Sequence, residues 1–134
     1  MDYFRAMMPE PAIGSPKVGR SARQLGVRVP PQFPPDVNPN GDGCVHPAAG
    51  GMSVAPQTVW NLPNHRRPRS MGRGSSGPSD DCVFVIEKNA ISEPLLVRHD
   101  KPIHALVEPA VIMSLSQYEE RLAATRVHWK IWNP

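Results

Sequence analysis

Three kinds of side chain in this sequence are suited to chemistry. Ser53 follows two glycines in the stretch GGMSV, and a serine hydroxyl becomes a nucleophile when a neighbouring base takes its proton. Glu108 lies near the end of the apolar run HALVEP, where partial desolvation would prepare its carboxyl group for acid–base work. Guanidinium groups bind phosphate oxygens through paired hydrogen bonds. They are concentrated in the stretch HRRPR, which contains His65, Arg66, Arg67 and Arg69.

Ser53 also allows a structural interpretation. The G-x-S-x-G pattern, which presents a serine nucleophile on a strand-to-helix turn, does not surround it. A histidine and an aspartate from elsewhere in the chain could still complete a triad with it. The absence of the pattern favours a turn serine whose hydroxyl binds backbone groups.

The basic stretch HRRPR has several interpretations. It could bind the phosphates of a nucleic acid, the pyrophosphate of a dinucleotide, or only water on a solvated loop. Sites for single-stranded nucleic acid hold bases on aromatic side chains as well as binding phosphates with cations. Trp60 is the one aromatic residue close by in the sequence, so the sequence does not decide between these ligands.

The run HALVEP alternates side chains between two faces, as a strand does. Glu108 then shares a face with His104 and Leu106, which favours partial burial of its carboxylate. A carboxylate at the rim of the sheet, in water, is the alternative. His99, Asp100 and His104 surround the preceding turn, and we interpret them as turn and solubility residues rather than ligands.

Several short strands are predicted to carry these residues. The run DYFRAMM alternates, so Arg5 lies on one face with Tyr3 and Met7. Further strands are predicted at CVFVIE, PLLVRH, HALVEP and VHWKIW, because apolar, β-branched and aromatic residues dominate them. The stretch NPNGDGCVHP contains Asn-Gly and Asp-Gly, the dipeptides that favour tight turns, and could close a hairpin.

One helix is predicted, in SLSQYEERLAATRV. Ser116 and Glu119 have the spacing of a capping box, and one stripe at helical spacing contains Leu115, Tyr118, Leu122 and Thr125. Twelve of the 17 prolines fall in the first 70 residues, which predicts extended chain and turns there. The fold prediction is a single α+β domain, residues 1–134, with short antiparallel strands, one main C-terminal helix and long loops rich in proline and glycine.

Charge is distributed unevenly along the chain. Residues 1–79 contain nine basic and four acidic side chains, whereas residues 80–134 contain six and eight. The net charge of +3 is too small to indicate nucleic-acid binding by itself. The first part of the chain is the part that suits a phosphate-bearing ligand.

The two cysteines lack the spacing of a metal or redox site. Cys44 and Cys82 are far apart, so two free thiols are favoured over a disulfide, and we expect no bound metal. Cys44 with His46 lacks a second pair of ligands for zinc. The sequence has no apolar run typical of a signal peptide or a membrane span, so we expect a cytoplasmic protein.

Three segments together resemble a family of small ADP-ribosyltransferase-like toxins, typified by the second type-six-exported effector of Pseudomonas. The segments are YFRAM near the start, DGCVHPAAGGMSV in the middle and LVRHDKPIHALVEPAVIMSLSQYEERLAATR near the end. Their order gives an aromatic-Arg strand, then a GG-x-SV element, then a strand that begins with His and ends with Pro, and finally a helix with L-x-A-T.

The resemblance implies a compact split β-sandwich with a cleft for NAD, and a toxin that transfers ADP-ribose to a macromolecule or to water in the cytosol of a target cell. It implies that Arg5 contacts NAD, that Ser53 shapes the nicotinamide pocket and that Glu108 holds the ribose as nicotinamide leaves. A carboxylate there stabilises the positive charge that develops on the ribose. Further candidates for contacting NAD are Trp60, His65, Arg66 and Arg67.

The sequence departs from the family pattern at two of these positions. Ser53 stands in Met-Ser-Val rather than Ser-Thr-Ser, and Glu108 has no glutamate two residues before it, which argues against transfer to arginine. The resemblance implies an immunity protein or antitoxin as a partner but does not identify the acceptor of ADP-ribose. The alternative function is a non-catalytic module that binds RNA or an acidic protein through its basic stretch.

Overall fold

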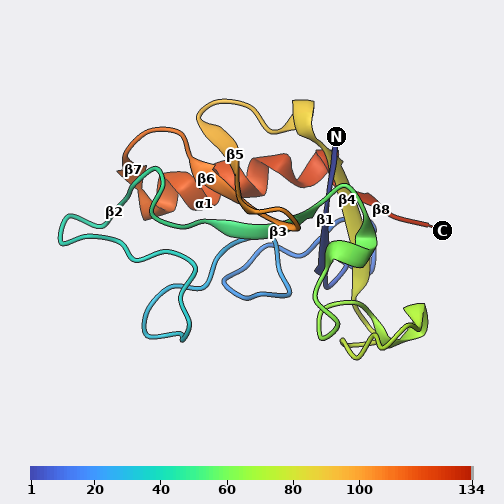
Figure 1. Cartoon of the computed structure of the whole chain (residues 1–134). Coiled ribbons are helices and arrows are strands. Elements are labelled where there is room, and N and C mark those ends of the chain that lie inside the picture. The colour runs from blue at the N-terminus through green and yellow to red at the C-terminus, as the bar shows by residue number, and fades with distance from the viewer. Residues whose placement is uncertain (134) are drawn as a thin grey trace.

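The structure, a computed structural model, describes residues 1–133. Within them, six strands form one antiparallel sheet in the order β5-β6-β3-β1-β4-β8 and two short strands pair separately as β2-β7 (Figure 1). The strands are β1 (Asp2–Met7), β2 (Cys44–Val45), β3 (Met52–Pro56), β4 (Cys82–Glu87), β5 (Leu95–Lys101), β6 (His104–Pro109), β7 (Met113–Ser114) and β8 (Lys130–Ile131). The chain therefore has the predicted α+β class, with short antiparallel strands and one main helix.

The sheet is split between β1 and β3. Strand β1 pairs with β4 along its whole length, from Asp2 opposite Glu87 to Met7 opposite Cys82. It pairs with β3 only at Tyr3 and Phe4, after which the two strands separate. Figure 1 shows β1 and β4 running across the direction of β3. The two halves of the sheet thus leave an opening at the split, next to Arg5.

The main helix, α1 (Leu115–Ala124), begins two residues earlier than the predicted capping box implies. The Ser114 hydroxyl accepts the backbone N–H of Gln117, and the Gln117 side chain accepts that of Ser114. The prediction of Ser116 and Glu119 as the capping pair was wrong, because Ser116 already lies inside the helix. Tyr118 and Leu122 are its buried residues, as the helical stripe predicted.

Two predictions of strand structure are corrected. Of the run VHWKIW, only Lys130–Ile131 is a strand, since the short 3₁₀ helix η4 (Thr125–His128) continues from α1. The stretch with Asn-Gly and Asp-Gly does form a turn, in which the Asn40 N–H donates to the Cys44 carbonyl. The strand that follows pairs with the distant β7, so the turn closes no hairpin of consecutive strands. Further 3₁₀ helices are η1 (Val59–Asn61), η2 (Arg69–Met71) and η3 (Lys88–Ala90).

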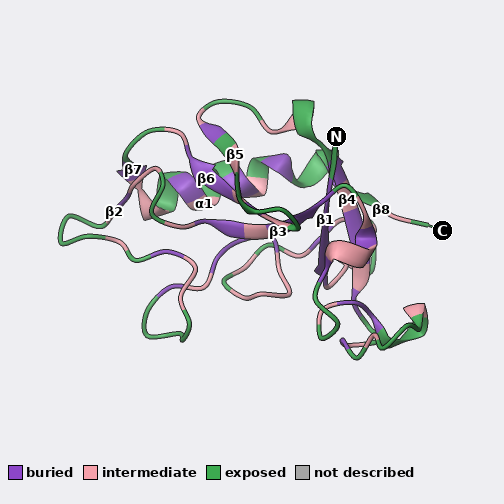
Figure 2. Cartoon of the chain, viewed as in Figure 1, coloured by how far each residue is buried: buried purple, intermediate pink, exposed green. Residues whose placement is uncertain are grey.

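The proline-rich segment 8–43 has no helix or named strand, yet it contributes to the main hydrophobic core. Its side chains in this core are Leu25, Val27, Val29 and Val37, and Figure 2 shows buried stretches along these loops. A second, smaller core contains Phe4, Ala55, Val59, Leu62 and Val83. The segment 59–71 packs on this second core and so lies beside the split in the sheet.

Cys44 and Cys82 are both free thiols, as predicted. Among the described residues, no helix is long and apolar enough to cross a membrane.

Candidate active site

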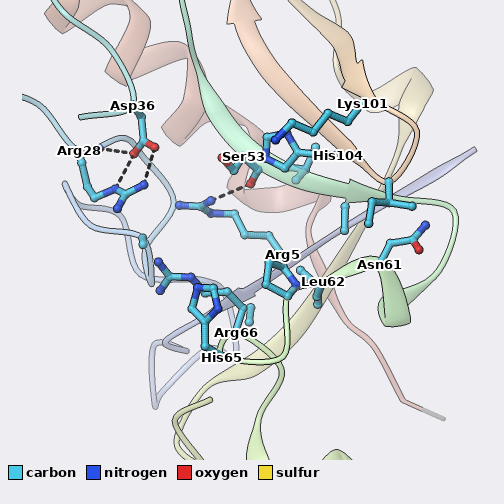
Figure 3. A pocket seen from close by; sticks show the side chains of 16 residues that line it. Arg5, Arg28, Asp36, Ser53, Asn61, Leu62, His65, Arg66, Lys101 and His104 are labelled. Carbon is cyan, nitrogen blue, oxygen red and sulfur yellow. Dashed lines mark hydrogen bonds and ion pairs between the residues drawn. The ribbon is translucent and has the colours of Figure 1, made fainter. Parts of the chain in front are cut away.

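A cavity of about 320 Å³ opens at the split in the sheet. Its wall comes from β1, β3, the tip of the β5–β6 hairpin, and the loop segments around residues 22–36 and 61–66 (Figure 3). The basic side chains on this wall are Arg5, Arg28, His65, Arg66, Lys101 and His104. Among the described residues, Asp36 is the one carboxylate that lines it. We call this cavity the cationic pocket.

Arg5 lies on the pocket wall, but its guanidinium is already bound. The backbone pairing of β1 with β3 ends at Phe4. The next residue, Arg5, reaches β3 with its side chain, and its Nη1 donates to the Ser53 carbonyl at 2.7 Å. Its Nε and Nη2 bind the carbonyls of Ser21, Gln24 and Gly26. Burial lowers the pKa of Arg5 to about 10, so the group stays charged at neutral pH. Arg5 thus joins the loop 21–26 to β3.

Ser53 is half-buried on β3 and its side chain lines the cationic pocket. Two features fix the strand at this point. The Tyr118 hydroxyl donates to the Val107 carbonyl at 2.5 Å and accepts the Met52 N–H at 3.1 Å. Gly51 comes so close to β6 that a Cβ there would lie 2.4 Å from the Val107 oxygen. The glycine before Ser53 therefore permits the strand pairing that carries the serine to the pocket.

The loop that ends at Asp36 is held by an ion pair on the pocket wall. Arg28 donates from Nη2 to Asp36 Oδ1 at 2.9 Å, and its backbone N–H donates to Oδ2 at 2.7 Å. Arg66, on the opposite segment, has no hydrogen-bonding or ionic partner for its side chain among residues 1–133. Its pKa is lowered by burial, and by repulsion from Arg28. Arg66 is therefore the pocket cation best prepared to bind an anion.

His104 lines the pocket together with Ser53, a role that the sequence interpretation missed. Its Nδ1 is 2.6 Å from the Asp100 Oδ1, so the carboxylate orients the imidazole and directs Nε2 away from itself. Ser53 lies opposite Leu106, and His104 is on the same face of β6 as Leu106. A sequence signal was available, because Asp100 and His104 are spaced to meet across the turn of a hairpin.

Glu108 does not line the cationic pocket, although it lies on the same face of β6 as His104 and Leu106, as predicted. Its side chain is almost fully buried, with 1% exposed. The Arg98 side chain on β5 donates to both of its carboxylate oxygens, at 2.8 Å for the shortest contact. The expected desolvation is present, and Arg98 compensates the charge.

Two of the residues predicted to contact NAD lie away from the pocket wall. Arg67 is buried, and its guanidinium binds the Leu62 carbonyl at 2.7 Å, the Ser75 hydroxyl and the Asn64 side chain. It lies over the ring of Trp60, which belongs to a different cavity. The pocket therefore brings together Arg5, Ser53, His65 and Arg66, but not Glu108, Trp60 or Arg67.

An α+β fold with a split antiparallel sheet, and a cationic pocket at the split, is compatible with the ADP-ribosyltransferase fold. Comparison with models of protein families matches residues 4–129 to the family described as Tse2 ADP-ribosyltransferase toxin. The chain belongs to this family, which confirms the resemblance found in its sequence. A search of curated proteins finds no sequence that matches it.

Proposed function

We propose that this toxin uses NAD as its substrate, cleaves the bond between nicotinamide and ribose, and passes ADP-ribose to a macromolecule or to water in the cytosol of a target cell. Family membership and the cationic pocket support the proposal. The observation that carries it is the position of Ser53, His104 and Arg66 around one cavity. Residues 1–134 would act as one domain, and an immunity protein or antitoxin would neutralise it.

The pocket wall suits a dinucleotide. The pyrophosphate of NAD is anionic, and guanidinium groups bind such oxygens in pairs. Arg66 offers a guanidinium with no partner on the described chain, while His65 and Lys101 are exposed at the same wall. Leu62, Pro63 and Ile103 add apolar surface for the rings.

The reaction needs two chemical contributions from the pocket. When the bond from ribose C1′ to the nicotinamide nitrogen breaks, its electron pair leaves with nicotinamide and positive charge develops on the ribose. The acceptor then adds to C1′ and loses a proton. We assign that proton to Nε2 of His104, which Asp100 holds in place, and we assign contact with the nicotinamide ribose to Ser53.

Two carboxylates are candidates for stabilising the charge on the ribose. The family resemblance assigns this role to Glu108, whereas Asp36 is on the pocket wall. Both are held by arginines in the free protein, Glu108 by Arg98 and Asp36 by Arg28. Separate Glu108→Gln and Asp36→Asn variants distinguish them, because only the carboxylate that stabilises the charge on the ribose should be required for cleavage of NAD.

The test is NAD consumption by the purified protein, followed as nicotinamide release. The unmodified protein should consume NAD, with or without cell lysate as a source of acceptors. We expect His104→Gln to lower the rate by roughly a hundredfold, the usual contribution of a positioned acid–base group. The matched control is His128→Gln, because His128 is exposed and does not line the pocket.

A second pair of variants tests substrate binding. Arg66→Ala should raise the KM for NAD, whereas Arg121→Ala, on the exposed surface of α1, should leave it unchanged. Absence of NAD consumption under every condition would contradict the proposal. The remaining function would then be the non-catalytic one, in which the basic stretch binds RNA or an acidic protein with an affinity that falls steeply with salt.

A further inference from the structure

A second cavity, of about 400 Å³, lies on the other side of the segment 59–71. Three parts of the chain that are far apart in sequence form it, and two of them each contribute a tryptophan. Its apolar wall contains Trp60, Met71, Val83, Ile131 and Trp132. We call it the tryptophan pocket. The sequence had shown only Trp60 near the basic stretch, and the fold brings Trp132 to the same cavity.

Both indole rings are partly accessible. Trp60 and Trp132 are half-buried, whereas the third tryptophan, Trp129, is 3% exposed in the main core. The guanidinium of the exposed Arg73 lies 4.3 Å from the centre of the Trp60 ring. Stacked arginine and tryptophan side chains form the kind of surface on which nucleobases stack.

Exposed basic side chains lie near this cavity, although among the described residues no lysine or arginine lines it. The exposed cations of the segments 60–73 and 130–133 are Arg69, Arg73 and Lys130. Arg66 lines the cationic pocket instead, and Arg67 is buried. Asp81 is the one acidic side chain that lines the cavity among the described residues. Arg23 neutralises it, with a shortest contact of 2.6 Å. The exposed cations beside the cavity therefore favour an anionic partner over a basic one.

The two cavities share a dividing wall. Asn61, Leu62 and Arg66 face the cationic pocket, while Trp60, Pro68 and Met71 line the tryptophan pocket. A ligand that occupies the tryptophan pocket is thus separated from the cationic pocket by a single stretch of chain. That position suits a molecule that must present one of its atoms to the ribose of NAD.

We propose that the acceptor of ADP-ribose is a single-stranded nucleic acid, and that the tryptophan pocket holds one of its unpaired bases. The proposal rests on the proposed function. Two indole rings provide stacking, while Arg69, Arg73 and Lys130 provide exposed cations for the phosphates. A duplex does not fit this role, because its bases are stacked on one another and cannot enter the cavity.

The transfer is a substitution at C1′ of the ribose. The bond from C1′ to the nicotinamide nitrogen breaks, and nicotinamide leaves with the electron pair. A lone pair on a nitrogen or oxygen atom of the strand forms the new bond to C1′, and the proton lost from that atom passes to His104 or to water. No oxidant or reductant is required.

Binding is tested first, without NAD, by the fluorescence anisotropy of a labelled single-stranded 16-nucleotide oligonucleotide. The Trp132→Leu variant keeps apolar volume but has no flat ring, and we expect it to weaken binding roughly tenfold. Trp132→Phe keeps a ring and should bind nearly as well as the unmodified protein. Arg73→Ala should lower the salt dependence of binding, and Arg121→Ala is the matched control outside the cavity.

Transfer is tested next, with radiolabelled NAD and the same oligonucleotide as single strand or as duplex. We expect label on the single strand only, and loss of that label in Trp132→Leu while NAD hydrolysis to nicotinamide continues. Equal binding by Trp132→Leu and the unmodified protein would overturn the proposal. So would label that appears on proteins of a cell lysate and never on the oligonucleotide.

These outcomes separate the two proposals. NAD consumption without any oligonucleotide binding or labelling would leave the proposed function intact and remove the nucleic-acid acceptor. Failure to consume NAD would contradict the proposed function and, with it, the acceptor role. The binding measurement would still decide whether the tryptophan pocket holds a base, because it requires no NAD.

Discussion

The Arg5 guanidinium donates a hydrogen bond of 2.7 Å to the backbone carbonyl of Ser53. The family resemblance implies that Arg5 and Ser53 both act at the NAD site. In the free protein Arg5 instead holds the backbone of Ser53. The other Arg5 donors bind carbonyls of the loop 21–26. In this state Arg5 bridges β1 and β3 at the split, and it positions the pocket wall on which Ser53 lies.

Arg5→Ala is therefore expected to destabilise the fold. It leaves the buried carbonyl of Gly26 and the partly buried carbonyls of Ser53 and Gln24 without this donor, and loss of a buried partner costs on the order of 1–3 kcal/mol. Urea unfolding should show a fall of roughly 3 kcal/mol or more in the free energy of unfolding. Arg121→Ala should change it by less than about 0.5 kcal/mol. A variant with unchanged stability and no cleavage of NAD would instead show that Arg5 acts on the substrate.

Glu108→Gln is expected to lower stability while NAD cleavage continues. The change removes the charge that Arg98 binds on an almost fully buried side chain, so the free energy of unfolding should fall. Urea unfolding and nicotinamide release measure the two effects. The control is Glu87→Gln, since Glu87 is exposed at the end of β4. A folded Glu108→Gln variant without NAD cleavage would show that Glu108 is the catalytic carboxylate, as the resemblance implies.

The strands and the family could be predicted from sequence because their signals are local. CVFVIE and HALVEP match β4 and β6 residue for residue, since alternation and β-branching act within each run. The cap of α1 was misplaced by two residues, because Ser114 and Ser116 both have a partner of the right type three residues later. The order of the segments was enough to indicate the family that residues 4–129 match.

The site was less predictable, because its geometry depends on contacts between distant segments. Nothing local indicates that Arg98 neutralises Glu108, or that Asp36 comes to the pocket from a proline-rich loop. Trp60 and Trp132 line one cavity only because the end of the chain returns beside β4. His104 could have been selected, since an aspartate four residues before it in a hairpin is placed to orient its ring.

The hydrogen bond between Asp100 and His104 predicts a pH-dependent contribution to stability. Burial raises the pKa of Asp100, but the hydrogen bond and charge of His104 outweigh it, and the pKa lies below its usual range. A pKa lower in the folded than in the unfolded state adds stability above about pH 4, and this stability is lost as the pH falls through the folded pKa. Asp100→Asn should therefore unfold at lower urea than the unmodified protein at pH 7.

That difference in urea midpoint should shrink as the pH falls towards about 2, roughly two units below the usual aspartate pKa, because the Asp100 carboxyl group becomes protonated and neutral like the asparagine. Asp42→Asn is the control, because Asp42 is exposed and its carboxylate has no partner among the described residues. A constant difference between the Asp100→Asn variant and the unmodified protein across this pH range would show that the carboxylate's charge does not stabilise the hairpin.

Gly51→Ala is expected to disturb the strand that carries Ser53. A Cβ at Gly51 would lie 2.4 Å from the Val107 oxygen, and this neighbour is backbone, which cannot move without breaking the pairing of β3 with β6. We expect a loss of roughly 1–3 kcal/mol in the free energy of unfolding. Gly41→Ala is the matched control, because a Cβ there meets nothing within 4 Å and should change stability by less than about 0.5 kcal/mol. Equal stability of the two variants in urea would show that β3 and β6 can separate at Gly51 at little cost, and that this glycine is not what fixes Ser53 at the pocket.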